Sequence, residues 1–267
     1  MSTRASWEDL APRAVSGLAL VVIGGVGLWW GGLVFQGLIA LVCALMLWEL
    51  MRICAPQPES APIQIAFLGA AVLMGSALVS GFFVLPAVLA VVLVGAGQAG
   101  AEQRVIWASY AAMILLAGVG MILLRLQAGP LWMGWLIGVV VATDIAGYFA
   151  GKRFGGPRLW ARVSPKKTWS GTLAGWAAAA LVGAGFAVWI GGDAGIVALA
   201  GLSVLLSAAS QAGDIAESAI KRRAGIKDSS GLIPGHGGFL DRFDGMIGAA
   251  LILLLIGAVA GFPPGVS

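Results

Sequence analysis

Apolar runs of about 20 residues follow one another along almost the whole chain, and they limit its fold more than any other feature. Only 10% of the residues are charged and 60% are hydrophobic. A soluble domain typically has about a quarter of its residues charged. The sequence therefore predicts an all-α polytopic integral membrane protein.

Nine transmembrane helices are expected when each span is required to be mostly apolar and long enough to cross a bilayer. Long runs are divided near Gly31 and Gly81, which predicts two tight hairpins. The first five spans form an N-terminal region, residues 1–130, and the last four form a C-terminal region with two polar loops, residues 131–267, that is expected to be catalytic. The spans are placed at 14–31, 33–51, 63–80, 82–98, 105–124, 131–150, 171–191, 195–213 and 243–262.

The basic residues predict the orientation of these spans. In the nine-span arrangement, 15 of the 16 Lys and Arg residues fall on one side and only Arg125 on the other. Basic residues are retained in cytoplasmic loops, so we expect a cytoplasmic N-terminus and a tail after Phe262 outside. No cleaved signal peptide is expected, because one apolar segment runs directly into the next.

A polar stretch from Ser218 to Asp244 stands out from this apolar background. It holds five Lys or Arg, three Asp and the only histidine, His236. Asp241 and Asp244 lie three residues apart, on one face of a helix, where they can share a hard cation such as Mg²⁺. Glycines at Gly237 and Gly238 let the backbone approach an anion closely. The alternative is a solvated basic loop whose Asp residues cap the next helix.

Two further carboxylates belong to other predicted spans. Asp144 lies inside the sixth span, where a charged group is costly and by default functional. Asp214 ends the eighth span, with Ser218 one helical turn later. We expect these acids and those of the ninth span to converge at one membrane depth.

The loop after the sixth span brings basic residues and hydroxyls together. Ser164, Lys166, Lys167 and Thr168 form a cluster suited to a triphosphate or a lipid phosphate. The alternative is a loop whose charge serves topology only, and we prefer it for four other basic residues: Lys152, Arg153, Arg158 and Arg162.

The polar stretch resembles the signature of the phosphatidate cytidylyltransferase (CDP-diacylglycerol synthase) family. The matching positions are Ser218, Ile220, Lys221, Arg222, Lys227, Asp228, Ser230, Ile233, Pro234, His236, Gly237, Gly238, Phe239, Asp241, Arg242, Phe243 and Asp244. The segments 144–148 and 164–169 are similar to two further motifs of the family, although Ile145 and Ser170 depart from them.

The resemblance implies a Mg²⁺-dependent integral membrane enzyme that joins CTP to phosphatidic acid and releases pyrophosphate. It implies that Asp214 and Asp241 are the leading metal ligands, followed by Asp244. The catalytic residues by resemblance are Asp214, Asp241, Asp244, Lys227, Asp228 and His236. His236 is either a base or a residue that organises the loop. Those expected to bind substrate are Ser164, Lys166, Lys167, Thr168, Ser218, Lys221, Arg222, Gly237, Gly238, Arg242 and Asp144.

The expected partners are CTP, phosphatidic acid and membrane lipids, with no nucleic acid, and a homodimer is kept as a hypothesis. The expected location is a bacterial inner membrane, with the active site facing the cytoplasm. Two other functions are weighed. A CTP-dependent lipid kinase would use the same nucleotide, metal and membrane, and a secondary transporter would also carry buried acids.

Topology can be tested by cysteine-accessibility labelling. We expect a cysteine at residue 160 to react only with a reagent supplied from the cytoplasm, and one at residue 265 only with a reagent supplied from outside, because of the distribution of basic residues. Labelling of both positions from the same side would contradict the nine-span arrangement.

Overall fold

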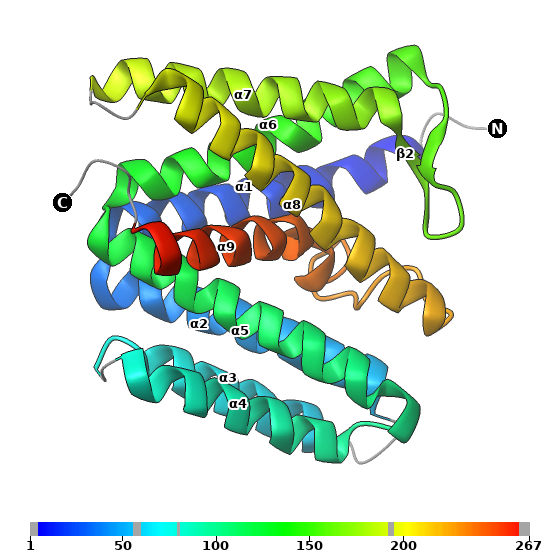
Figure 1. Cartoon of the computed structure of the whole chain (residues 1–267). Coiled ribbons are helices and arrows are strands. Elements are labelled where there is room, and N and C mark those ends of the chain that lie inside the picture. Colours follow the sequence, from blue (N-terminus) through cyan, green and yellow to red (C-terminus); the bar gives the residue numbers. More distant parts are fainter. Residues whose placement is uncertain (1–4, 56–59, 79–80, 192–194, 262–267) are drawn as a thin grey trace. The chain divides into compact units, whose positions relative to one another are not determined.

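The computed structural model describes residues 5–55, 60–78, 81–191 and 195–261, which form nine α-helices, a short 3₁₀ helix and two β-strands (Figure 1). The helices of the N-terminal half are α1 (Ala5–Trp30), α2 (Gly32–Cys54), α3 (Ser60–Gly75), α4 (Gly81–Gln98), η1 (Ala101–Gln103) and α5 (Arg104–Gln127). The remaining elements are α6 (Pro130–Phe154), β1 (Arg158–Trp160), β2 (Ser164–Thr168), α7 (Trp169–Ile190), α8 (Ile196–Arg223) and α9 (Leu240–Ala260).

A helix occupies each of the nine predicted span positions. Six segments of the described residues are long and apolar enough to cross a membrane: α2, η1 with α5, α6, α7, α8 and α9. Shorter apolar segments lie in α1, α3 and α4. The predicted span ends at residues 80 and 262, the tail after Phe262 and the basic residue Arg4 lie outside the described residues.

Two features differ from the sequence prediction. α8 continues to Arg223 instead of ending at residue 213. Asp214 and Ser218 therefore lie within the helix, in the polar part that follows its apolar part. The all-α prediction also missed a β-hairpin, in which β1 pairs antiparallel with β2. Its strands are too short and too polar to show the alternating apolar pattern by which a strand is recognised.

The predicted division near Gly31 is confirmed. Gly31 and Gly32 have φ angles of 70° and 50°, a left-handed conformation that side chains with a Cβ rarely adopt. The glycines therefore permit the sharp turn from α1 into α2.

The chain divides into two compact units. The first comprises Met1–Ile122 and Arg223–Phe243, and the second comprises Leu123–Arg222 and Asp244–Ser267. Most of the polar stretch and the first residues of α9 thus pack with the first unit, whereas the rest of α9 packs with the second.

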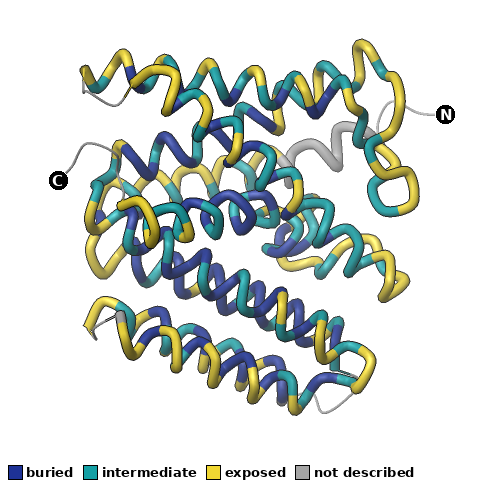
Figure 2. The backbone as a smooth tube through the Cα atoms, viewed as in Figure 1, coloured by how far each residue is buried: buried dark blue, intermediate teal, exposed yellow. Residues whose placement is uncertain are grey.

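The first unit is built on α2, which packs along α1 and α3. Leu47, Leu50 and Met51 of α2 are fully buried. Figure 2 draws buried stretches of the backbone, such as those along α2 and α5, in dark blue. Trp107 of α5 is also fully buried, and its indole N–H donates a hydrogen bond of 3.0 Å to the carbonyl of Val92. This bond satisfies the one polar atom of a large apolar side chain.

The second unit is held by close contacts between helices. α6 packs along α7, where Trp132 and Phe186 meet edge to face with their ring centroids 5.1 Å apart. α8 approaches α9 through Gly248, where an added Cβ would overlap the carbonyl oxygen of Ala209. Small residues at such positions let membrane helices approach at backbone distance.

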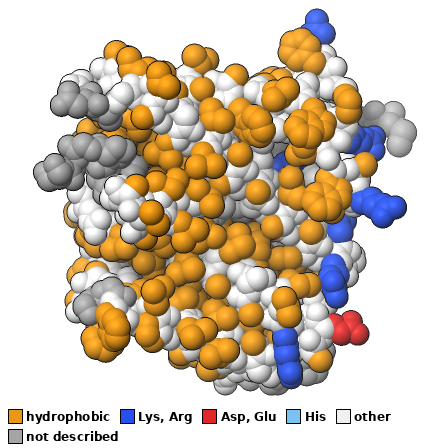
Figure 3. All heavy atoms as spheres, viewed as in Figure 1, with side chains coloured by type: hydrophobic (Ala, Val, Ile, Leu, Met, Phe, Trp, Pro, Cys, Tyr) orange, Lys and Arg blue, Asp and Glu red, His pale blue; other side chains and the backbone are white. Residues whose placement is uncertain are grey.

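Large apolar side chains remain exposed over much of the chain, and hydrophobic side chains cover most of the face drawn in Figure 3. Val197 and Val259 are 85% and 90% exposed. Soluble monomers rarely expose large continuous apolar surfaces. By length, composition and surface, the chain is an integral membrane protein.

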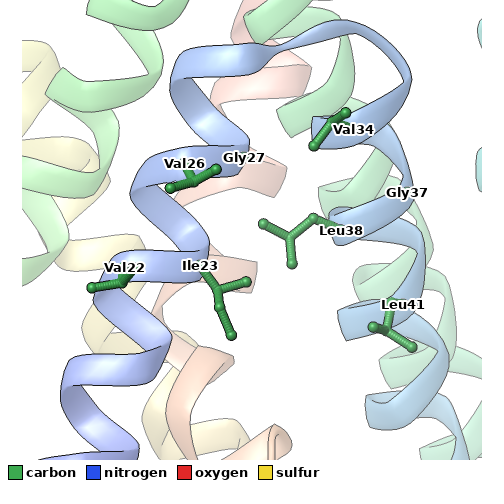
Figure 4. Close-up of a pocket in the computed structure, with 8 residues that line it drawn as sticks. All are labelled: Val22, Ile23, Val26, Gly27, Val34, Gly37, Leu38 and Leu41. Atoms are coloured by element: carbon green, nitrogen blue, oxygen red, sulfur yellow. The ribbon is translucent and has the colours of Figure 1, made fainter.

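An apolar pocket of about 400 Å³ lies between α1 and α2 (Figure 4). Val22 and Val26 line it from α1, and Leu38 and Leu41 line it from α2. None of the predicted site residues contributes to this pocket.

We predict that Gly248→Ala destabilises the protein by about 1–3 kcal/mol, because the added methyl group overlaps backbone that cannot move aside. The matched control is Gly201→Ala on α8, where an added Cβ meets no atom within 4 Å. Thermal unfolding in detergent measures both. Equal unfolding temperatures for the two variants would contradict the proposed contact between α8 and α9.

Candidate active site

An ion pair between Lys167 and Asp214 forms the centre of the polar site in the second unit. Lys167 Nζ on β2 lies 2.5 Å from Asp214 Oδ2 on α8. The same ammonium donates a hydrogen bond of 3.3 Å to the backbone carbonyl of Gln211. Ser218, one turn along α8, donates from its hydroxyl to Asp214 Oδ1 over 3.3 Å. The hairpin and α8 are therefore joined at Asp214.

Two more carboxylates interact with this ion pair. Asp144 on α6 and Asp244 on α9 are each repelled by the charge of Asp214 and attracted by that of Lys167. The backbone N–H of Gly245 donates a hydrogen bond of 2.8 Å to Asp244 Oδ1. We call Asp144, Lys167, Asp214 and Asp244 the carboxylate–lysine cluster. Three acids therefore share one ammonium within this cluster.

The acids of this cluster have the oxygen chemistry that a hard divalent cation prefers, but they do not have the arrangement of a metal site. Carboxylate oxygens are the ligands that Mg²⁺ prefers, and here they come from three different helices. Within the described residues, no three His, Cys, Asp or Glu side chains stand in the arrangement of a metal site. Lys167 already pairs with one oxygen of Asp214.

Hydrogen bonds at the junction of β2 and α7 fix the backbone next to Lys167. Thr168 caps this helix, because its hydroxyl accepts a hydrogen bond of 3.2 Å from the N–H of Gly171. Ser170 donates to the carbonyl of Gly155 over 2.5 Å, which ties the start of α7 to the end of α6. Lys166 is exposed and Ser164 is half-buried.

Residues 224–239, which we call the signature loop, form the second polar region and belong to the first unit. Asp241 Oδ2 accepts three hydrogen bonds from this loop. The donors are the backbone N–H of Ser229 at 2.9 Å, the hydroxyl of Ser229 at 2.8 Å and the N–H of Gly238 at 2.7 Å. One oxygen of Asp241 therefore holds the loop against the first turn of α9.

His236 also takes part in organising this loop. Its Nδ1 lies 2.8 Å from the hydroxyl of Ser16 on α1, and that hydroxyl contacts the carbonyl of Pro234 at 3.0 Å. Arg242 Nε donates to the carbonyl of His236 over 2.8 Å. Gly237 has a φ angle of 84°, and its carbonyl accepts a hydrogen bond of 2.8 Å from the N–H of Ile233. These contacts agree with the loop-organising alternative for His236.

The remaining predicted residues lie at the end of α8 and in the loop. Lys221 forms an ion pair of 2.7 Å with the buried Glu217, one turn earlier. Arg222, Lys227 and Asp228 are exposed. Asp144, Lys167, Asp214, Ser218 and Asp244 thus meet within the second unit, whereas His236, Gly238, Asp241 and Arg242 meet within the first.

Sequence reasoning missed several residues of both regions. Ser16, Ser229 and Gln211 carry no distinctive pattern in the sequence. Glu49 is different, because an acid inside an apolar span is a recognisable signal. In the structure Glu49 is fully buried and accepts hydrogen bonds from the signature loop and from the start of α9.

Comparison with known proteins places these residues in a family. The model of the cytidylyltransferase family matches residues 11–260. The chain belongs to this family. The match includes both polar regions, so the carboxylate–lysine cluster and the signature loop lie within the part that the family shares.

Curated relatives carry the name phosphatidate cytidylyltransferase. The chain is 46% identical over 164 residues to the relative from Brucella suis, covering 57% of this chain and 58% of that protein. It is 38% identical over 154 residues to the relative from Pseudomonas aeruginosa, covering 56% of each. It is 36% identical over 149 residues to the one from Mycobacterium bovis, covering 53% of this chain and 46% of that protein. The chain thus spans about half the length of the curated relatives it matches.

We predict that Asp241→Ala loosens the signature loop, because the N–H groups of Ser229 and Gly238 lose their shared acceptor. Hydrogen exchange of peptides from 228–240 should become faster. Asp228→Ala is the control, because Asp228 is exposed in the same loop. Unchanged exchange in Asp241→Ala would show that Asp241 does not hold the loop.

Proposed function

We propose that this protein is a CTP:phosphatidate cytidylyltransferase, which makes CDP-diacylglycerol and pyrophosphate. The observation that carries the proposal is the carboxylate–lysine cluster, in which Lys167 and Asp214 pair beside Asp144 and Asp244. Membership of the cytidylyltransferase family and the names of the relatives support the choice of nucleotide and lipid.

The proposed reaction is a displacement at phosphorus. A phosphate oxygen of phosphatidic acid forms a bond to the α-phosphorus of CTP, and the bond from that phosphorus to the α,β-bridging oxygen breaks. Pyrophosphate leaves with the bonding electrons. The attacking phosphate is already ionised near neutral pH, so the reaction needs positioning and charge neutralisation more than a protein base.

The residues of the cluster fit these needs. The ammonium of Lys167 is the basic group placed to offset phosphate charge, and Asp214 orients it. Ser218 holds the other oxygen of Asp214 and thereby fixes the carboxylate. Arg242, Lys227 and Arg222 are further cations for phosphate oxygens on the exposed side of the polar stretch.

Mg²⁺ is the cofactor that we propose. Asp214 and Asp244 of the second unit would hold it, with Asp144 contributing charge, because hard oxygen ligands suit this ion. When bound, the ion would supply charge neutralisation at the phosphates.

The same proposal includes a topology and a location. All nine helices cross a bacterial inner membrane, with the N-terminus in the cytoplasm, the C-terminus outside and the active site facing the cytoplasm. The distribution of basic residues supports this orientation. A homodimer is the proposed assembly.

The decisive experiment supplies purified protein with phosphatidic acid, Mg²⁺ and CTP labelled at either the α- or the γ-phosphate. We expect the α-label in the lipid product, the γ-label in pyrophosphate, and loss of turnover when the metal is chelated. Transfer of the γ-label to lipid would identify a lipid kinase instead. No label in lipid from either nucleotide would overturn the proposed function.

We predict that Lys167→Ala raises the KM for CTP or phosphatidic acid more than it lowers stability. The side chain sits in a polar hairpin and is about a quarter exposed (23%), so its truncation creates no core cavity. Lys166→Ala is the matched control, because that neighbour is exposed. If the kinetics of Lys167→Ala equal those of the parent, Lys167 serves topology only.

We predict that Asp214→Asn lowers kcat by on the order of 100-fold while the protein stays folded. Asparagine keeps the volume and one oxygen but removes the negative charge that orients Lys167 and attracts a divalent cation. Activity as a function of Mg²⁺ concentration, together with thermal unfolding in detergent, measures both parts. Near-parental kcat at the parental Mg²⁺ optimum would exclude Asp214 as a metal ligand.

A further inference from the structure

Glu49 is a buried carboxylate on the apolar helix α2. The side chain is fully buried, and α2 continues past it to Cys54. A buried carboxylate is costly unless several hydrogen bonds satisfy its oxygens. The hydrogen-bond donors around Glu49 therefore indicate its role.

Among the described residues, the hydrogen-bond donors to Glu49 come from the polar stretch of the first unit. Glu49 Oε1 accepts from the hydroxyl of Ser230 at 2.5 Å and from the backbone N–H of Phe239 at 3.0 Å. Glu49 Oε2 accepts from the N–H of Leu240 at 2.7 Å. Leu240 is the first residue of α9, and the first N–H groups of a helix lack partners within it. Glu49 therefore caps α9 from another helix, and its negative charge lies at the positive end of the α9 dipole.

Gly238 shows how tightly this contact is built. An added Cβ at Gly238 would overlap both Glu49 Oε1 and the hydroxyl oxygen of Ser229. The N–H of Gly238 donates in turn to Asp241 Oδ2. The last residues of the signature loop are thus held between two carboxylates, Glu49 on α2 and Asp241 on α9.

We propose that Glu49 is a positioning residue that fixes the first turn of α9 and, with it, the carboxylates of Asp241 and Asp244. This inference rests on the proposed function, because it assigns Glu49 a role in the same reaction. Asp241 directly follows Leu240, and Asp244 lies one turn further along the helix. Both carboxylate oxygens of Glu49 accept hydrogen bonds. The contact therefore requires a side chain that has two acceptor oxygens and the length of glutamate.

The kinetic test uses Glu49→Gln and Glu49→Ala. Glutamine keeps one acceptor oxygen, so we expect it to retain part of the function that alanine loses. We expect kcat to fall about tenfold or more in Glu49→Ala, because a small displacement of reacting groups has a large effect on rate, while the KM for CTP changes less than about twofold. Glu102→Gln is the control for removing an exposed acid from the same unit.

Ser230→Ala provides a second route to the same contact while the carboxylate of Glu49 stays in place. It removes one donor to Glu49 Oε1, and we expect a smaller fall in kcat, with no further fall when it is combined with Glu49→Ala. If Glu49→Ala does not fold, Glu49→Gln and Ser230→Ala carry the test. Parental kcat in both would overturn the proposal.

Hydrogen exchange supplies a readout that does not depend on activity. In Glu49→Gln we expect faster exchange in peptides containing Phe239 and Leu240, and unchanged exchange in α3 and α4. Unchanged exchange at Phe239 and Leu240 would overturn the capping role, as would a general increase throughout the unit. If the parent makes no CDP-diacylglycerol but the local exchange responds, the proposed function fails while the cap stands.

Discussion

A carboxylate buried among apolar helices must find hydrogen-bond donors or a counter-charge, and this requirement shapes both polar regions of the protein. Glu49 meets it with one hydroxyl and two backbone N–H groups. Asp214 is only partly buried, with 32% of its side chain exposed, and it pairs with the ammonium of Lys167 and the hydroxyl of Ser218. Because an unsatisfied charge in such surroundings costs several kcal/mol, each acid constrains the segments that carry its partners. Irregular backbone among membrane helices is tolerated only where its polar groups are satisfied in this way.

The two regions use their acids differently. In the signature loop, the carboxylates of Glu49 and Asp241 accept mainly from the backbone and therefore set the path of the chain. In the carboxylate–lysine cluster, Asp144, Asp214 and Asp244 outnumber the single ammonium of Lys167. In the first arrangement hydrogen bonds satisfy the carboxylates, whereas in the second three acids share one ammonium.

Rigid support comes from close helix packing. Gly213 and Gly248 bring α8 against α9, because an added Cβ at either would overlap backbone of the other helix. Asp214 directly follows Gly213 in the chain, so the close approach also fixes the carboxylate nearest to Lys167. Packing and chemistry are thus coupled along one stretch of α8.

The sequence by itself determined the membrane class, the positions of nine helices and the polar residues that belong to the family signature, because hydropathy and motif spacing are local properties of the chain. It also indicated the turn at Gly31, which the positive φ angle confirms. Only the tertiary structure showed that Lys167 pairs with Asp214, that Asp241 Oδ2 holds Ser229 and Gly238, and that Glu49 caps α9. Glu49 and Leu240 are far apart in sequence, and no local pattern specifies which buried acid will meet which unpaired N–H groups. That choice depends on how the helices pack, since the partner must lie within hydrogen-bond distance only after the chain has folded.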